Sequence, residues 1–230
     1  MTLQQSGEWG LALSRRLSLP RYHIRKHLTN FAQMIGPSHL ILDIGSGRLA
    51  PYRPLFDYER YVAIDYFEWA DVRADASHLP FASESASVIL STEVFEHLPE
   101  PVEALREVRR VLQDHGYFIL TVPLVWGVHD YVDYQRWTER GLTKFLNEAG
   151  YEVLEFRQRG GIFSMLGCMI TQIPRQIFGS LSQQSHWWTR GAYALTWAVT
   201  LPIPWLASFF DYFDRSKDFT LGYSVLCRKQ

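Results

Sequence analysis

The sequence predicts an α/β protein with a doubly wound, mostly parallel sheet. Short apolar segments alternate with segments of helical periodicity along most of the 230 residues, which is the pattern of linked β–α–β units. The composition suits one large domain of this kind, because 47% of the residues are hydrophobic. The formal net charge is −1 and the basic residues are scattered, so nucleic acid is not an expected partner.

Apolar runs of strand length and helical repeats can be assigned in order along the chain. Helices are predicted where apolar residues at helical spacing are bounded by Pro, Thr or Gly, over 22–35, 101–116 and 138–150. The carboxyl ends of the first four strands meet at one sheet edge, where open α/β sheets bind ligands. The predicted strands are 39–43, 60–65, 71–75, 86–91, 116–123, 151–156 and 222–229.

Glycines and carboxylates follow the first three strands. Gly45 and Gly47 let the chain turn sharply and let a ligand approach the backbone. Asp65 ends the second strand, where a carboxylate suits the two hydroxyl groups of a ribose. Asp75 ends the third, where a carboxylate can accept a hydrogen bond from an adenine amino group. Together these residues predict a nucleoside that lies across strands one to three.

Two kinds of nucleoside cofactor fit this turn. Residues 45–50 match G-x-G-x-x-G/A, the dinucleotide fingerprint. Asp43, two residues before the first glycine, repels a pyrophosphate but attracts an ammonium group. A ligand with an adenosine end and an amino-acid end is therefore favoured. An NAD(P)-dependent oxidoreductase or epimerase and a non-catalytic cofactor-binding scaffold stay open as alternatives.

The sequence resembles class I S-adenosylmethionine-dependent methyltransferases of the type 11 group in four stretches that lie within roughly residues 39–156. The resemblance implies a Rossmann-like seven-stranded sheet of order 3-2-1-4-5-7-6, with strand 7 antiparallel. It also implies S-adenosyl-L-methionine as the cofactor and an O or N atom of a small-molecule, saccharide or lipid-linked acceptor. The stretches are ILDIGSG, VAID, ADASHLPFASESASVILSTEVFEHLPEPVEALREVRRVLQDHGYFILTVP and RWTERGLTKFLNEAGYEV.

The same resemblance implies the cofactor contacts. Arg48, Leu49 and Ala50 stand where relatives commonly have a further small residue and a third glycine, so no contact is assigned to Arg48. The implied contacts are Gly45, Ser46 and Gly47 beside the methionine part, Asp43 at its amino group, Asp65 at the ribose, Asp75 and Ala76 at the adenine, and Glu93 in the loop after strand four.

Methyl transfer from a sulfonium mainly requires alignment of the reacting atoms and exclusion of water. A general base helps when the acceptor is a hydroxyl group or a protonated amine. His129, which has carboxylates nearby, and His97, after the fourth strand, are the candidate catalytic bases. A solvated loop histidine and a structural histidine are the respective alternatives. No metal site is predicted, because Cys168 and Cys227 lie in no ligand cluster.

An apolar segment separates the last two strands. Residues 160–174 and 191–210 carry no charge, and Pro202 and Pro204 interrupt the second of these runs. The chain is expected to divide into an N-terminal helical cap (1–37), a methyltransferase core (38–159 plus 220–230) and a helical insertion (160–219). The insertion is expected to meet a membrane surface, a second subunit or the core. The expected location is the cytoplasm, with peripheral attachment at the inner face of the membrane as the alternative.

Overall fold

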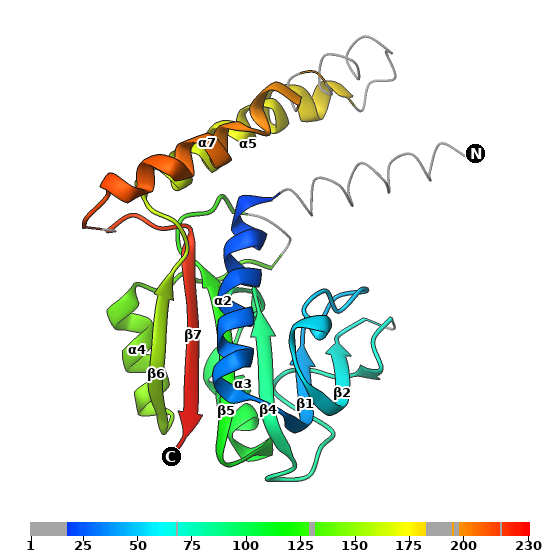
Figure 1. Cartoon of the computed structure of the whole chain (residues 1–230). Coiled ribbons are helices and arrows are strands. Elements are labelled where there is room, and N and C mark those ends of the chain that lie inside the picture. The colour runs from blue at the N-terminus through cyan, green and yellow to red at the C-terminus, as the bar shows by residue number, and fades with distance from the viewer. Residues whose placement is uncertain (1–17, 68, 129–131, 183–194, 196–197, 217) are drawn as a thin grey trace. The chain divides into compact units, whose positions relative to one another are not determined.

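The computed structural model describes residues 18–67, 69–128, 132–182, 195, 198–216 and 218–230 (Figure 1). Packing divides the chain into two compact units. We call residues 24–157 and 222–230 the sheet unit, and residues 1–23 and 158–221 the hairpin unit. The three-part division expected from the sequence stays a prediction.

A seven-stranded sheet of order β3-β2-β1-β4-β5-β7-β6 organises the chain. β1 is parallel to β2 and β4, β4 is parallel to β5, and β7 is antiparallel to β5. The predicted fold class, strand order and strand 7 direction are thus confirmed. The strands are β1 (Ser38–Ile44), β2 (Tyr58–Asp65), β3 (Val72–Arg73), β4 (Ala86–Thr92), β5 (Leu112–Pro123), β6 (Tyr151–Gln158) and β7 (Gly222–Lys229).

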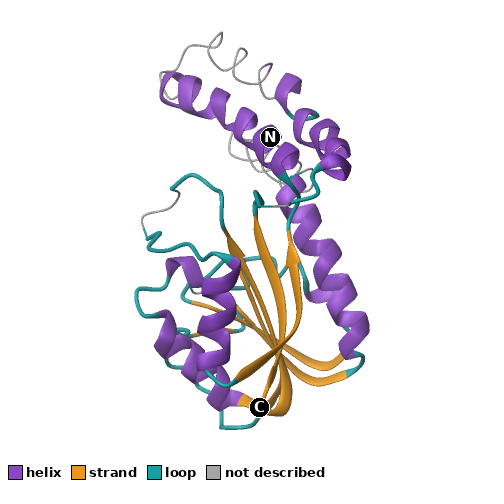
Figure 2. Ribbon diagram, turned by 90° about the vertical axis from the view of Figure 1, so that its left-hand side faces the viewer, coloured by secondary structure: helices purple, strands orange, loops and turns teal. Residues whose placement is uncertain are grey.

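Helices cover both faces of the sheet (Figure 2). α2 (Leu19–Ile35) places Leu28 and Phe31 in a core with Ile41 and Ile119 on one face. α3 (Pro101–Val111) and α4 (Glu139–Glu148) bury their apolar stripes on the other face. Thr138 caps α4 as predicted, because its hydroxyl accepts a hydrogen bond from the Gly141 N–H. Short 3-10 helices occur at η1 (Arg53–Leu55) and η2 (Phe95–His97).

The helix predicted over 101–116 is too long, which is a correction. α3 ends at Val111, and Leu112 already belongs to β5, opposite Ala86 of β4. Pairing with the preceding loop replaces the last helical hydrogen bonds, because the N–H groups of Glu84 and Ser85 bind the carbonyl groups of Arg110 and Val111. This tertiary pairing overrides the helical periodicity, which in the sequence continues as far as His115 and Gly116.

The third strand is shorter than predicted and does not end on Asp75. β3 comprises Val72 and Arg73, which pair with the end of β2. The Ala74 N–H still donates to the Asp65 carbonyl, but Asp75 forms an isolated bridge with His78. As an edge strand with one neighbour, β3 stops where β2 stops. Asp75 therefore lies in a turn just past the sheet edge.

The hairpin unit contains α5 (Ile162–Ser182), α7 (Ile203–Phe210) and η3 (Asp211–Phe213). The two helices approach closely, since a Cβ built on Gly167 would lie 2.8 Å from Pro204 Cα. Pro202 is the N-cap residue of α7 and Pro204 lies in its first turn, so the prolines begin a helix where the sequence predicted an interruption. None of the helices in the described ranges is long and apolar enough to cross a membrane.

Candidate functional site

The predicted glycine turn follows β1 directly. Gly45 has φ +68°, and a Cβ there would lie 2.2 Å from Val94 Cγ2. Gly47 also has a positive φ of +61°, but a Cβ there would meet no atom within 4 Å. The N–H groups of Gly45 and Ser46 donate to the Ile64 carbonyl at 2.8 and 3.1 Å. β2 thus fixes the turn, and Gly47 faces open space where a ligand can approach the backbone.

Asp65 connects the end of β2 to this turn. Its Oδ2 accepts a hydrogen bond from the Gly47 N–H at 2.9 Å, and its Oδ1 accepts one from the Phe67 N–H at 3.2 Å. The carboxylate is half-buried, so it also keeps contact with solvent. Asp65 and the glycine turn are therefore hydrogen-bonded to each other at the carboxyl edge of the sheet.

Asp43 is a buried carboxyl group behind the turn. Its Oδ2 accepts a hydrogen bond from the Tyr61 hydroxyl at 2.6 Å. Its Oδ1 is buried and has no hydrogen-bond partner among the described atoms. Burial raises the pKa of Asp43 from 3.8 to about 7, the Tyr61 hydrogen bond opposes this, and the charge of Asp65 adds to it. A cationic donor placed at Oδ1 would satisfy this atom, so the site fits an ammonium group.

The residues predicted at the adenine end lie at the third strand end. Asp75 is exposed, and its Oδ1 accepts a hydrogen bond from the Ser77 N–H at 2.8 Å. Ala76, beside it, is buried. The structure thus places Asp75 where solvent or a ligand reaches its second oxygen, although in a turn and not in a strand.

Glu93 begins the loop after β4 in a constrained conformation. Its φ is +55°, which a side-chain-bearing residue rarely adopts. Its N–H donates to the Thr121 carbonyl at 3.0 Å, and its Oε1 accepts from the Thr121 hydroxyl at 2.9 Å. β5 therefore fixes Glu93 at the carboxyl edge of the sheet, and backbone strain of this kind is concentrated at functional sites.

Next along this loop lie His97 and a charged cluster. His97 Nδ1 is hydrogen-bonded to the Val132 carbonyl, which makes Nδ1 the protonated nitrogen of the neutral ring. Nε2 lies 3.7 Å from Oε1 of Glu96, a residue with no exposed surface. Arg136 forms a bidentate ion pair with Asp133. The hydrogen bond to Asp133 is the main cause of the raised pKa of Arg136, and the charge of Glu96 raises it by a smaller amount. The basic nitrogen of His97 thus faces a buried carboxyl group.

Several of these residues are not evident from the sequence. The sequence pattern does not single out Tyr61, Glu96 or Arg136, although Glu96 adjoins His97 in the chain. Gln135 also holds the loops together, because its Nε2 donates to the carbonyl groups of Phe95 and Leu98 at 3.1 and 2.8 Å. The other candidate base, His129, lies outside the described residues.

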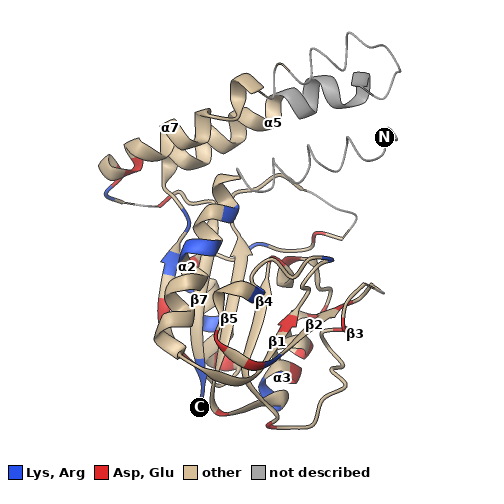
Figure 3. Cartoon of the chain, turned by 45° about the vertical axis from the view of Figure 1, so that its right-hand side comes forward, with Lys and Arg blue, Asp and Glu red and all other residues tan. Residues whose placement is uncertain are grey.

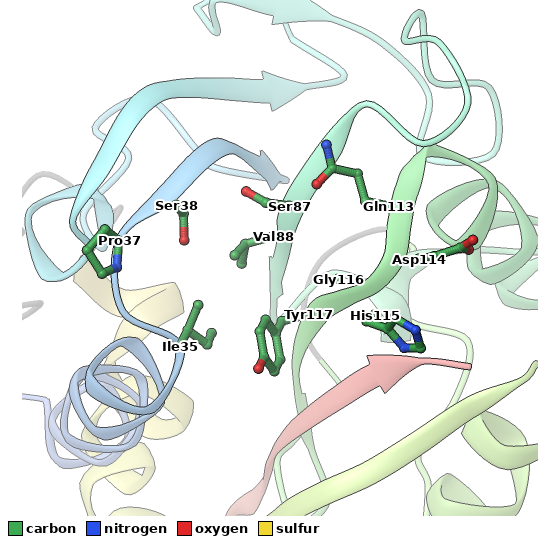
Figure 4. A pocket seen from close by; sticks show the side chains of 10 residues that line it. All are labelled: Ile35, Pro37, Ser38, Ser87, Val88, Gln113, Asp114, His115, Gly116 and Tyr117. Atoms are coloured by element: carbon green, nitrogen blue, oxygen red, sulfur yellow. The ribbon is translucent and has the colours of Figure 1, made fainter.

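A pocket elsewhere on the sheet unit does not coincide with this site. Its lining includes Ser38, at the start of β1, and Ser87, at the start of β4 (Figure 4). These are the amino ends of the strands, opposite the glycine turn. Within the described ranges, no three His, Cys, Asp or Glu side chains are grouped so that they could hold a metal ion.

The strand order β3-β2-β1-β4-β5-β7-β6, with β7 antiparallel to β5 and a glycine turn after β1, is the fold of class I methyltransferases. Residues 42–120 match the family model of a methyltransferase domain. A demethylmenaquinone methyltransferase of Chlamydia felis is 29% identical over 118 residues, which cover 44% of this chain and 50% of that protein. The chain spans about half the length, or less, of the curated relatives it matches.

Solved structures share the fold. A putative methyltransferase of Bacillus halodurans has a TM-score of 0.57 at 19% identity, covering 89% of this chain and 98% of that one. A 1,6-didemethyltoxoflavin-N1-methyltransferase of Burkholderia thailandensis, solved with S-adenosylhomocysteine, has a TM-score of 0.55 at 14% identity and covers 90% of this chain and 78% of that one. The resemblance to class I methyltransferases predicted from the sequence is thereby confirmed.

Proposed function

We propose that this chain is an S-adenosylmethionine-dependent methyltransferase that transfers a methyl group to an oxygen or nitrogen atom. The observation that carries the proposal is the unsatisfied buried oxygen of Asp43 directly behind the glycine turn. An ammonium group satisfies this oxygen, whereas a pyrophosphate is repelled by it. The matched methyltransferase domain and the structural neighbour with S-adenosylhomocysteine support the same cofactor.

The cofactor contacts follow from the strand ends. Asp43 would hold the amino group, and the turn of Gly45, Ser46 and Gly47 would lie beside the methionine part. The contacts at the nucleoside would be Asp65 at the ribose, Asp75 and Ala76 at the adenine, and Glu93 from the loop after β4.

The cofactor supplies an activated methyl group, so this chain mainly has to orient the acceptor and exclude water. A hydroxyl acceptor also has to lose a proton, and we assign His97 as its base. The Val132 carbonyl holds Nδ1 and leaves Nε2 as the basic nitrogen. Glu96 would stabilise the imidazolium that forms, since its Oε1 lies 3.7 Å from Nε2. His129 stays a second candidate base, and the acceptor would be a small molecule, a saccharide or a lipid-linked compound.

Replacement of Asp65 tests the cofactor assignment. Asp65→Ala should weaken S-adenosylhomocysteine binding by about 1–3 kcal/mol, because it removes an acceptor for the ribose and the partner of the Gly47 N–H. Asp71→Ala is the matched control, since Asp71 also accepts one backbone hydrogen bond, from the Ala63 N–H at 2.9 Å, but is not bonded to the glycine turn. Equilibrium dialysis with labelled S-adenosylhomocysteine measures both. Equal affinities of Asp65→Ala and the wild type would remove Asp65 from the site.

A further inference from the structure

The helices of the hairpin unit expose apolar side chains along one stripe each. On α5 the exposed positions follow helical spacing, and on α7 they do the same. The rings of Phe163 and Phe210 are 5.9 Å apart, so the two stripes meet. We call this set the outer apolar surface; its members are Phe163, Leu166, Met169, Ile170, Ile173, Leu206, Phe209 and Phe210.

Packing of the two helices leaves most members of the outer apolar surface exposed, although Phe163 and Phe210 also contact each other. Other apolar residues of α5, such as Met165 and Cys168, are buried. Gly167 allows the close approach, because a Cβ there would also lie 3.0 Å from Ala207 Cβ. Leu206 and Phe209 remain 67% and 76% exposed. A contiguous exposed surface of this kind marks a site of interaction.

In the coloured part of the hairpin in Figure 3, α5 and α7 are uncharged and the charged residues follow the end of α7. Residues 160–174 and 198–210 contain no Asp, Glu, Lys or Arg. Asp211 and Asp214 follow α7, but their carboxylates bind the first N–H groups of α5, with distances of 2.8 Å from Gly161 and 2.9 Å from Ile162. The α5 N-terminus thus offsets their negative charge. Arg215 and Asp218, which follow in the chain, are both exposed.

The sequence of the insertion contains further cations and tryptophans. The cations are Arg175, Arg190 and Lys217, and the tryptophans are Trp187, Trp188 and Trp197. For Arg175 the structure describes the backbone alone, and the other five lie outside the described residues. Trp and basic residues that flank uncharged stretches in the sequence are typical of segments that lie in a membrane interface.

We propose that the outer apolar surface docks on an anionic lipid bilayer, with α5 and α7 lying in its interface. A second copy of the chain would need complementary hollows for Leu206 and Phe209 and about one hydrogen bond per 100–200 Å² of contact. Among residues 162–173 of α5, whose side chains the structure describes, Gln172 is the only one with an amide group. Lipid chains need neither hollows nor hydrogen bonds, and lipid phosphates suit the cations that flank the uncharged stretches in the sequence.

The point at which the insertion joins the sheet gives this docking a functional consequence. Gly222, where the chain re-enters the sheet, pairs with Pro123 at the carboxyl end of β5. The insertion is therefore connected at the edge that carries the glycine turn and the strand-end carboxylates. If the proposed function holds, the acceptor is an amphiphile or a lipid-linked saccharide that is methylated at the bilayer surface. This part of the inference rests on the proposed function, whereas the docking itself does not.

Vesicle flotation of the full chain tests the docking. The wild type should float with vesicles of phosphatidylcholine and phosphatidylglycerol, and less with phosphatidylcholine alone. The double variant Leu206→Glu/Phe209→Glu should bind at least about tenfold more weakly, because it replaces two apolar side chains that the bilayer would bury. Val102→Glu is the matched control, since Val102 is an exposed apolar residue of α3 in the sheet unit. S-adenosylhomocysteine binding by each variant reports separately on folding and on the proposed function.

Two results would overturn the inference. In the first, the wild type stays with the soluble fraction and sediments as a dimer, whereas the double variant sediments as a monomer. This result would assign the surface to a second copy of the chain. The other is flotation of the double variant equal to that of Val102→Glu. Flotation of a wild type that does not bind S-adenosylhomocysteine would leave the docking intact and refute the proposed function.

Discussion

His97→Ala is expected to lower turnover by about 10²–10⁴-fold with little change in cofactor affinity, if the acceptor is a hydroxyl group. The reason is that His97 Nε2 would take the acceptor proton while Glu96, 3.7 Å away, stabilises the resulting charge. Methyl transfer is measured with S-adenosylmethionine labelled in the methyl group, using the aqueous or lipid extract that supports turnover by the wild type. Added imidazole should restore part of the activity.

His39→Ala serves as the matched control, because His39 is an exposed histidine that pairs with Glu59 at the start of β1. His129→Ala is measured in parallel. If turnover of His97→Ala falls only in step with cofactor affinity or stability, and imidazole restores nothing, His97 acts by holding the Val132 loop and is not the base.

Asp43→Asn is expected to stabilise the cofactor-free protein at alkaline pH while weakening S-adenosylhomocysteine binding. The pKa of Asp43 rises from 3.8 to about 7 on folding, so the folded state favours the protonated form. Near pH 4 and below, the group therefore contributes no pH-dependent penalty. Stability is then lost as pH rises towards 7, and the penalty above that pH is about 4 kcal/mol. Asparagine stays neutral and can still accept the Tyr61 hydrogen bond.

Urea unfolding of the wild type and Asp43→Asn between pH 4 and pH 8.5 measures this penalty. The difference in unfolding free energy should be small near pH 4 and should grow to a few kcal/mol above pH 7. Glu59→Gln, which removes a carboxyl group whose side chain is 75% exposed, controls for the loss of one charge. Parallel pH profiles of the wild type and Asp43→Asn would show that Asp43 is not a strained buried acid.

Much of the fold and the cofactor edge is predictable from local sequence signals. The glycine turn is predictable because Gly45 needs both a positive φ and the absence of a Cβ beside Val94. The end of β2 at Asp65 follows from four consecutive buried residues before it. These signals lie within a few residues of the feature they specify, and the resemblance adds the order of the strands.

The remaining features depend on partners that are distant in the chain. The end of α3 at Val111 is set by pairing between Leu112 and Ala86, which helical periodicity does not reveal. Tyr61 is 18 residues from the Asp43 carboxyl group it binds. His97 is 35 residues from the Val132 carbonyl group that fixes its ring. A sequence pattern indicates such side chains as buried or polar but not as partners.

The central claim is that the glycine turn after Asp43 binds an adenosine cofactor with an amino-acid end. Calorimetric titration of the wild-type chain with S-adenosylhomocysteine, and with NAD in parallel, tests it most directly. The buried oxygen of Asp43 predicts that S-adenosylhomocysteine binds with a 1:1 stoichiometry and that NAD binds at least about tenfold more weakly. Tighter binding of NAD, or no heat with S-adenosylhomocysteine from a folded sample, would contradict the assignment.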